Sequence, residues 1–124
     1  MEGIGKTRIA GTVGGMKTDE RSHMRKKVIA SCDDHWALKL HAASVGHQLQ
    51  ATQVRAMQRL VSAYESSPTE LKRTAQEVGA VRSRFYWMVD PADWDQFVAL
   101  RSASGLSTAE LLHVAVQLET SQSN

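Results

Sequence analysis

One order of predicted elements occurs twice in the chain: a short apolar strand, an amphipathic helix with a tryptophan, a glycine turn and a second apolar helix. The first copy covers residues 27–64 and the second covers residues 84–119. Trp36 and Trp94 lie 58 positions apart, and the two strands superpose best at a separation of 57. A single unit of about 40 residues seldom buries enough apolar surface to fold alone. We therefore expect the two copies to pair inside one domain.

Local signals define the elements of the first copy. Alternating apolar residues predict a strand over residues 27–32, and Asp33 is expected to cap the helix that follows, residues 34–45. Gly46 supplies the left-handed residue that ends this helix, and a second helix is predicted over residues 48–64. Three residues repeat at helical spacing and form the predicted apolar stripe of the first helix: Trp36, Leu40 and Ala43.

A linker helix is predicted between the copies, over residues 68–78. Ser67 is suited to cap it, Pro68 to occupy its first turn and Glu70 to return the capping-box hydrogen bond. Gly79 would then end this helix.

The second copy carries the clearer boundary signals. Its strand, residues 84–89, is dense in aromatic residues, which favour strands. Asp90 and the proline after it predict the start of a helix. Gly105 lies 59 positions after the corresponding glycine of the first copy, and Ser107 with Glu110 forms a capping-box pattern for the last helix. The paired domain should therefore span residues 27–119, followed by a frayed tail over residues 120–124.

Charge is unevenly distributed although the net charge is only +2. Residues 1–26 lack apolar periodicity and are rich in Gly, Lys, Arg and Thr, which predicts a flexible basic arm. Such an arm commonly contacts nucleic acid, and a solvated tail without a partner is the alternative. Three basic residues at its end are the candidate contacts: Arg21, Arg25 and Lys26.

The cysteine content and hydropathy exclude several classes of protein. Cys32 is the single cysteine, so the chain forms no intrachain disulfide, and its place in the strand pattern predicts a packing role. No stretch approaches the ~18 apolar residues of a membrane span, and the amino terminus lacks a signal-peptide core. We therefore expect a cytoplasmic protein that does not enter a membrane.

The second copy resembles the ribbon-helix-helix superfamily over about 35 residues, and the first copy resembles it more loosely over a similar length. The resemblance implies that two copies pair their strands into an antiparallel ribbon, that four helices wrap together as the core, and that the ribbon enters the major groove of double-stranded DNA. It rests on these residues: Val89-Asp90-Pro91, Trp94, Phe97 and Gly105-Leu106-Ser107-Thr108-Ala109-Glu110-Leu111-Leu112.

The presence of both copies in one chain is similar to accessory DNA-binding proteins of conjugative relaxosomes and of T-DNA processing. This resemblance implies a mainly helical intramolecular pseudo-dimer that binds near a transfer origin or border and helps a relaxase. We expect an internally paired monomer, with further assembly of chains on longer DNA left open. A transcriptional repressor or antitoxin of the same superfamily is the alternative. A small helical module that binds another protein through its aromatic strand is an alternative of another class.

Strand alternation divides the side chains between two faces. Val28, Ala30 and Cys32, with Phe85, Trp87 and Val89, are assigned to the core. The opposite phase, or cover by another element, is the alternative, because the other face is itself partly apolar. Six residues on that other face are the base-reading candidates: Lys27, Ile29, Ser31, Arg84, Tyr86 and Met88. Lysine and arginine donate to guanine edges, serine pairs with several bases, and isoleucine or methionine contacts a thymine methyl.

Phosphate contacts are predicted at the amino ends of the second helices, where backbone amides and the helix dipole favour an anion. Gln48 and Gln50 lie there in the first copy, and Ser107 and Thr108 in the second. If the copies are aligned at 57 positions, their outward strand residues all differ, and this predicts an asymmetric DNA site.

Catalytic and metal-binding patterns are weak. Asp33, Asp34 and His35 cluster at a helix start, where acidic residues are favoured for capping. His35, His41 and His47 recur every six residues, which scatters them around a helix. We therefore expect no enzymatic activity, no cofactor and no metal.

Overall fold

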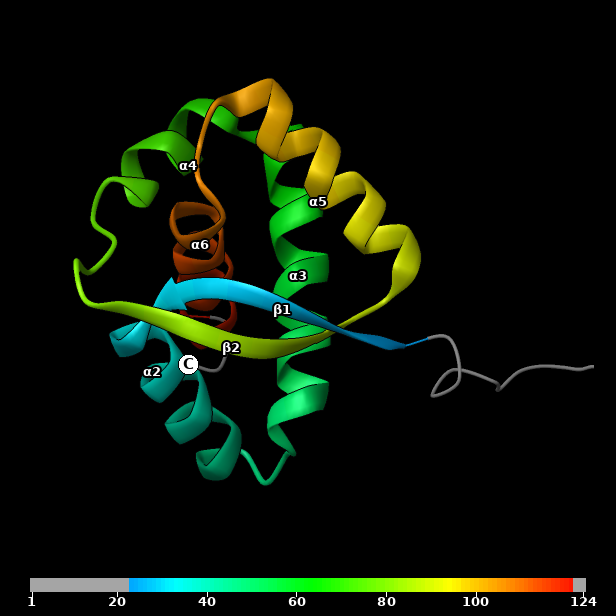
Figure 1. Ribbon diagram of the computed structural model, residues 1–124, viewed down its shortest axis with the longest axis vertical. Helices are drawn as coiled ribbons and strands as arrows, with labels where there is room; N and C mark the ends of the chain where they lie inside the picture. The colour runs from blue at the N-terminus through cyan, green and yellow to red at the C-terminus, as the bar shows by residue number, and fades with distance from the viewer. Residues whose placement is uncertain (1–22, 122–124) are drawn as a thin grey trace, which may run out of the picture.

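Two antiparallel strands cross one face of a group of helices in the computed structural model, which describes residues 23–121 (Figure 1). The strands are β1 (Met24–Ser31) and β2 (Arg82–Val89). The helices are α2 (Cys32–Ser44), α3 (Leu49–Ser66), α4 (Pro68–Ala75), α5 (Pro91–Ser104) and α6 (Thr108–Ser121). The predicted class, mainly helical with a two-stranded antiparallel sheet, is confirmed. Within this described part of the chain, no helix is long and apolar enough to cross a membrane.

The two strands form a regular ribbon with one buried face. Lys27 pairs with Tyr86, and the register continues over all eight residues of each strand. The side chains that face the helices are buried at Val28, Ala30, Trp87 and Val89, which agrees with the predicted inward face. Pleating then directs the alternate side chains away from the helices.

Both strands begin earlier than the sequence pattern indicated. β1 starts at Met24 instead of Lys27, so Arg25 and Lys26 belong to the strand and not to an arm. β2 starts at Arg82 instead of Arg84. Charged residues broke the apolar alternation, but their backbones still pair with the opposite strand. Residues 1–22, with the predicted contact Arg21, lie outside the described residues.

Helix α6 lies at the centre of the helices and supplies much of the core (Figure 1). It packs against α2, α3, α4 and β1. Burial of each leucine or valine side chain contributes roughly 1.5–3 kcal/mol, so this helix anchors the fold. Its buried apolar residues are Ala109, Leu111, Leu112, Val114, Ala115 and Val116.

The predicted helix boundaries are confirmed most fully in the second copy. Asp90 Oδ1 accepts a 2.9 Å hydrogen bond from the amide of Ala92. Ser107 and Glu110 form the capping box, with the Ser107 amide 2.7 Å from Glu110 Oε1 and the Glu110 amide 3.2 Å from Ser107 Oγ. Gly105 has φ of +75°, and Gly46 has φ of +74°. Both turns use the left-handed conformation that glycine adopts without strain.

The predicted apolar face of α2 is wrong. Trp36 is 58% exposed and Leu40 is 68% exposed, whereas Leu38 and Ala42 are buried. Asp34 shares the buried stripe because its carboxylate lies 2.8 Å from Nδ1 of His113 on α6. A polar residue at a core position hid the true stripe from the sequence pattern.

Three capping predictions for the chain before the second strand are also wrong. Ser31, not Asp33, occupies the N-cap position of α2, and Cys32 is the first residue of that helix instead of the last of the strand. Ser67 precedes α4 without forming a side-chain cap, although Pro68 occupies the predicted first turn. Helix α4 ends at Ala75, several residues before Gly79.

Candidate nucleic-acid interface

The ribbon face directed away from the helices carries cations and no acidic residue. Neither β1 nor β2 contains an aspartate or glutamate. A surface of this composition has a positive field, and an anionic polymer is its natural counterpart. We call this surface the outer ribbon face, and its residues are Arg25, Lys27, Ile29, Arg82, Arg84, Tyr86 and Met88.

Tyr86 organises the centre of the outer ribbon face. Its side chain is 55% exposed. Arg25 Cζ lies 5.0 Å from the ring centroid and Lys27 Nζ lies 5.7 Å from it, so two cations rest against one ring. Cation–π contacts at exposed sites are worth about 0.5–1 kcal/mol each. The ring therefore limits the freedom of both cations before any ligand binds.

Lys26 points to a different environment from Arg25. Its ammonium group lies 5.3 Å from the ring centroid of Trp94 on α5. Its neighbours in β1, Arg25 and Lys27, are exposed, whereas Lys26 is half-buried. Of the three predicted arm contacts, Arg25 thus joins the outer ribbon face and Lys26 packs against α5.

Ser31 does not belong to the exposed surface, which corrects its prediction as a base-reading residue. It is completely buried, because the chain before β2 closes over the end of β1. The Cys32 amide donates to the Val81 carbonyl at 2.9 Å. Gly79 lies so close that an added Cβ would come within 2.8 Å of Ser31 Oγ.

Arg82 occupies the strand position opposite Ser31 and is exposed. The sequence pattern missed this residue, because the predicted strand began two residues later. A basic residue two positions before the predicted aromatic strand was the available signal. The outer ribbon face therefore holds four cations, since Arg25 and Arg82 join Lys27 and Arg84.

A hollow of about 470 Å³ joins the outer ribbon face to the amino end of α6. It brings predicted base-reading residues, Lys27 and Ile29, together with predicted phosphate residues, Ser107 and Thr108. The remaining residues around it are Val28, Arg82, Trp94, Arg101 and Ala109.

Arg101 fixes the geometry of this hollow. Its Nη1 donates a 2.9 Å hydrogen bond to Thr108 Oγ1, which holds a guanidinium beside the first turn of α6. The first amides of a helix lack partners within the helix and carry the positive end of its dipole. The capping box already uses the amides of Ser107 and Glu110, so the hollow combines the amides of Thr108 and Ala109 with the side chains of Lys27, Arg82 and Arg101.

The corresponding helix start in the first copy is built differently. Gln48 and Gln50 are exposed at the amino end of α3, and Gln48 makes no side-chain cap. Arg55 Nη2 lies 2.8 Å from Nδ1 of the neighbouring His47. The structure thus places Gln48 and Gln50 on the surface but does not bring them into the hollow beside α6.

Gln53 fixes the ribbon from below and was not predicted. Its Nε2 donates to the Tyr86 carbonyl at 3.0 Å, and its Oε1 accepts from the Met88 amide at 2.9 Å. The carboxamide thereby satisfies the backbone edge of β2 as a neighbouring strand would. The sequence signal was a glutamine at a position of the apolar stripe of α3, and the structure shows that its side chain is buried.

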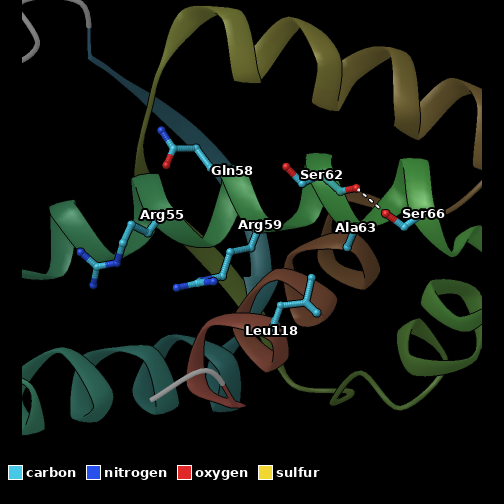
Figure 2. Close-up of a pocket in the computed structure, with 7 residues that line it drawn as sticks. All are labelled: Arg55, Gln58, Arg59, Ser62, Ala63, Ser66 and Leu118. Carbon is cyan, nitrogen blue, oxygen red and sulfur yellow. Dashed lines mark hydrogen bonds between the residues drawn. The ribbon is translucent and has the colours of Figure 1, made fainter. Parts of the chain in front are cut away.

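A second hollow, of about 480 Å³, lies along α3 and receives Leu118 from α6 (Figure 2). Its two arginines already bind one buried carboxylate. Arg59 Nε lies 2.7 Å from Glu119 Oε1, and Arg55 donates twice to Glu119 Oε2 at 3.2 Å. His41 Nε2 lies 3.4 Å from the same oxygen. This ion cluster joins α2, α3 and α6, which indicates a structural role.

Burial raises the pKa of Glu119, but hydrogen bonds and charge from Arg59 and Arg55 outweigh it. The net effect holds the pKa of this carboxyl below its ordinary value of 4.5. Glu119 therefore stays ionised at neutral pH and keeps its arginine partners.

No protein-family model, no curated protein and no solved structure matches this chain. The function must therefore be inferred from the geometry of the described residues.

Proposed function

We propose that this protein is a non-enzymatic double-stranded DNA-binding protein that inserts its β1–β2 ribbon into the major groove. The observation that carries this proposal is the outer ribbon face, with four cations and no acidic residue on either strand. The major groove of B-DNA admits a two-stranded ribbon and displays a distinct donor and acceptor pattern for each base pair. Arg25, Lys27, Arg82 and Arg84 supply donors for guanine edges or phosphates, and Ile29 and Met88 supply contacts for thymine methyl groups.

The fold proposed for this function is a tandem ribbon-helix-helix pseudo-dimer. Lys27 and its partner Tyr86 are 59 positions apart, which is also the separation of the left-handed glycines Gly46 and Gly105. When two symmetric repeats pair, two equivalent residues that face each other lie on the two-fold axis. This agreement supports a pseudo-two-fold axis through the middle of the ribbon.

The 59-residue relation changes which outward residues correspond. Arg25 then matches Arg84, Ile29 matches Met88, and the asymmetry is concentrated where Lys27 matches Tyr86. When the repeats are instead aligned at a separation of 57 residues, each outward strand residue of the first repeat differs from its counterpart in the second. The proposed DNA site therefore has similar flanks, read by two arginines and two apolar residues, around an asymmetric centre.

Phosphate binding is proposed at the helix starts on either side of the ribbon. Arg101, Ser107 and Thr108 surround the amino end of α6, whereas Gln48 and Gln50 flank the amino end of α3. The two sides differ in charge, so the duplex should be held more firmly beside α6. Such contacts position the protein without reading sequence.

The cellular role proposed is accessory DNA binding in plasmid transfer or T-DNA processing, in the cytoplasm and with a relaxase as partner. The sequence resemblance to tandem accessory proteins supports this role. A repressor or antitoxin would use the same ribbon on an operator, and a transfer origin as the target would favour the accessory role.

The decisive test is equilibrium binding to random-sequence duplex DNA at increasing salt concentration. Binding that depends on phosphate neutralisation weakens linearly in log–log form, and loss of one phosphate contact reduces the slope by about 1. Arg82→Ala should weaken binding, whereas Arg73→Ala, an exposed cation on α4, should not. Absence of binding at low salt, or equal effects of the two variants, would rule out this interface.

A further inference from the structure

Helix α2 exposes an apolar ridge that the fold does not require. Trp36 and Leu40 are among the most exposed large hydrophobic residues of the described chain. Lys39 Nζ lies 5.1 Å from the Trp36 ring, so a cation belongs to the same surface. The positions 59 residues later on α5 are Asp95 and Ala99, so the second repeat within the chain has no such ridge. Contiguous exposed apolar side chains mark an interaction surface.

A complementary surface lies on the other side of the molecule. A hollow of about 260 Å³ separates α3 from α5 and is lined mainly by apolar residues. Small side chains at Ala99 and Ala103 form its α5 wall, Val61 and Leu100 contribute apolar surface, and Glu65 lies at α3. Figure 1 places α2 and α5 at opposite sides of the ribbon. We call this hollow the α3–α5 groove and the surface formed by Trp36, Lys39 and Leu40 the α2 ridge.

We propose that the α2 ridge of one protein molecule docks into the α3–α5 groove of a second, identical molecule. The apolar side chains of Trp36 and Leu40 match the lining of the groove. Charge matches as well, because Glu65 lines the groove that would receive Lys39, and Asp95 is exposed about one helical turn before Ala99 on α5. Pairing two ridges with each other would instead bring two Lys39 side chains together, and like charges disfavour that arrangement.

The proposed contact joins two different surfaces, so a docked pair still has one free ridge and one free groove, and each can bind a further molecule. Contacts of this heterologous type produce open chains unless the rotation closes a ring. The contact area is small because it centres on one tryptophan and one leucine, and interfaces of that size are weak. Association should therefore grow with protein concentration instead of giving a fixed dimer. It involves neither strand and goes beyond DNA binding.

Sedimentation velocity of the full chain without DNA tests the proposal across a concentration series. The wild-type protein should form species larger than a dimer as its concentration is raised. Trp36→Ala removes the ridge and Ala99→Trp fills the groove, and each should lower the association constant by about tenfold or more. Both positions are exposed, so the variants should keep the wild-type circular dichroism spectrum.

Mixing the two variants gives the sharpest result. The groove of Trp36→Ala and the ridge of Ala99→Trp are intact, so an equimolar mixture should form a one-to-one dimer and stop there. A wild-type protein that stays monomeric at every concentration overturns the proposal. An Ala99→Trp variant that associates as strongly as wild type also overturns it, because the ridges would then pair with each other. So does a mixture that remains monomeric.

A charge exchange provides an independent check. Lys39→Glu and Glu65→Lys should each weaken association, and the double variant should recover it. Loss of association that the double variant does not recover contradicts the proposed orientation. These outcomes are separate from the proposed function, because no DNA is present and the outer ribbon face is unchanged.

Discussion

Lys27 and Tyr86 face each other at the middle of the ribbon, and the lysine ammonium lies 5.7 Å from the centroid of the tyrosine ring. Arg25, one step along the same face, approaches that ring to 5.0 Å. An aromatic ring at this position therefore arranges two cations that would otherwise sample many rotamers. Preorganised donors lose less conformational entropy on binding than free ones.

Replacement of Tyr86 tests this arrangement. Tyr86→Ala removes both cation–π contacts, worth about 1–2 kcal/mol together, and should reduce DNA affinity roughly tenfold. Tyr86→Phe keeps the ring and serves as the matched control, with affinity close to wild type. Fluorescence anisotropy with a labelled duplex would measure both. Equal losses in the two variants would show that the hydroxyl group, not the ring, is needed.

Arg25 and Arg84 should read equivalent positions in the two flanks of the DNA site. A bidentate arginine–guanine pair discriminates against other bases by about 1–3 kcal/mol. Arg25→Ala should therefore relax base preference in one flank, and Arg84→Ala should relax it in the other. Selection from a randomised duplex library, followed by sequencing, would reveal both changes. Lys72→Ala on α4 is the control, because it should leave all preferences intact. Unchanged preferences in both arginine variants would contradict base reading by this face.

Glu119 should make stability depend on acidity. Its pKa in the folded protein lies below the ordinary value of 4.5, despite burial, because Arg59 and Arg55 favour the charged form. A group with a lowered folded pKa contributes its full stabilisation above the unfolded pKa and loses it as pH falls through the folded pKa. The wild-type protein should thus lose stability as the pH drops below about 4.5 and the folded carboxyl becomes protonated.

The variant Glu119→Gln isolates this contribution. It should lower the free energy of unfolding at pH 7 by about 1–3 kcal/mol, because two arginines lose a charged acceptor. Its stability should also fall less steeply with acid than that of the wild type. Urea denaturation at neutral and acidic pH measures both effects. Parallel pH profiles for the two proteins would exclude Glu119 as the source.

Sequence patterns located the elements well where local chemistry sets their ends. Asp90, Gly105 and the Ser107–Glu110 box act on neighbouring amides, so spacing alone revealed the helices of the second copy. The register of the ribbon could not be obtained this way, because it depends on two segments almost 60 residues apart.

The exposed face of α2 was mispredicted for a long-range reason. Asp34 is buried because His113 lies against it, and these residues are 79 positions apart. Aspartate is assigned to the surface when only the hydrophobic pattern is used, and this assignment placed Trp36 on the core side of the helix. The prediction that Ser31 is exposed was wrong for a similar reason, since the chain near Gly79 covers this residue. Such burial follows from tertiary packing and leaves little local trace.

Gln53 should prove more important for the ribbon than its polar character indicates. Gln53→Leu keeps a similar volume but removes both hydrogen bonds to β2, which leaves the Tyr86 carbonyl and the Met88 amide without this partner. An unsatisfied buried polar group costs about 1–3 kcal/mol, so the free energy of unfolding should fall by at least that amount. Gln50→Leu, on the exposed surface of the same helix, should change it by less than about 0.5 kcal/mol. Thermal and urea denaturation measure the difference.

Hydrogen exchange at Met88 should also accelerate in Gln53→Leu, since its amide loses its acceptor. Unaltered exchange at that amide would mean that Gln53 does not hold the ribbon in solution.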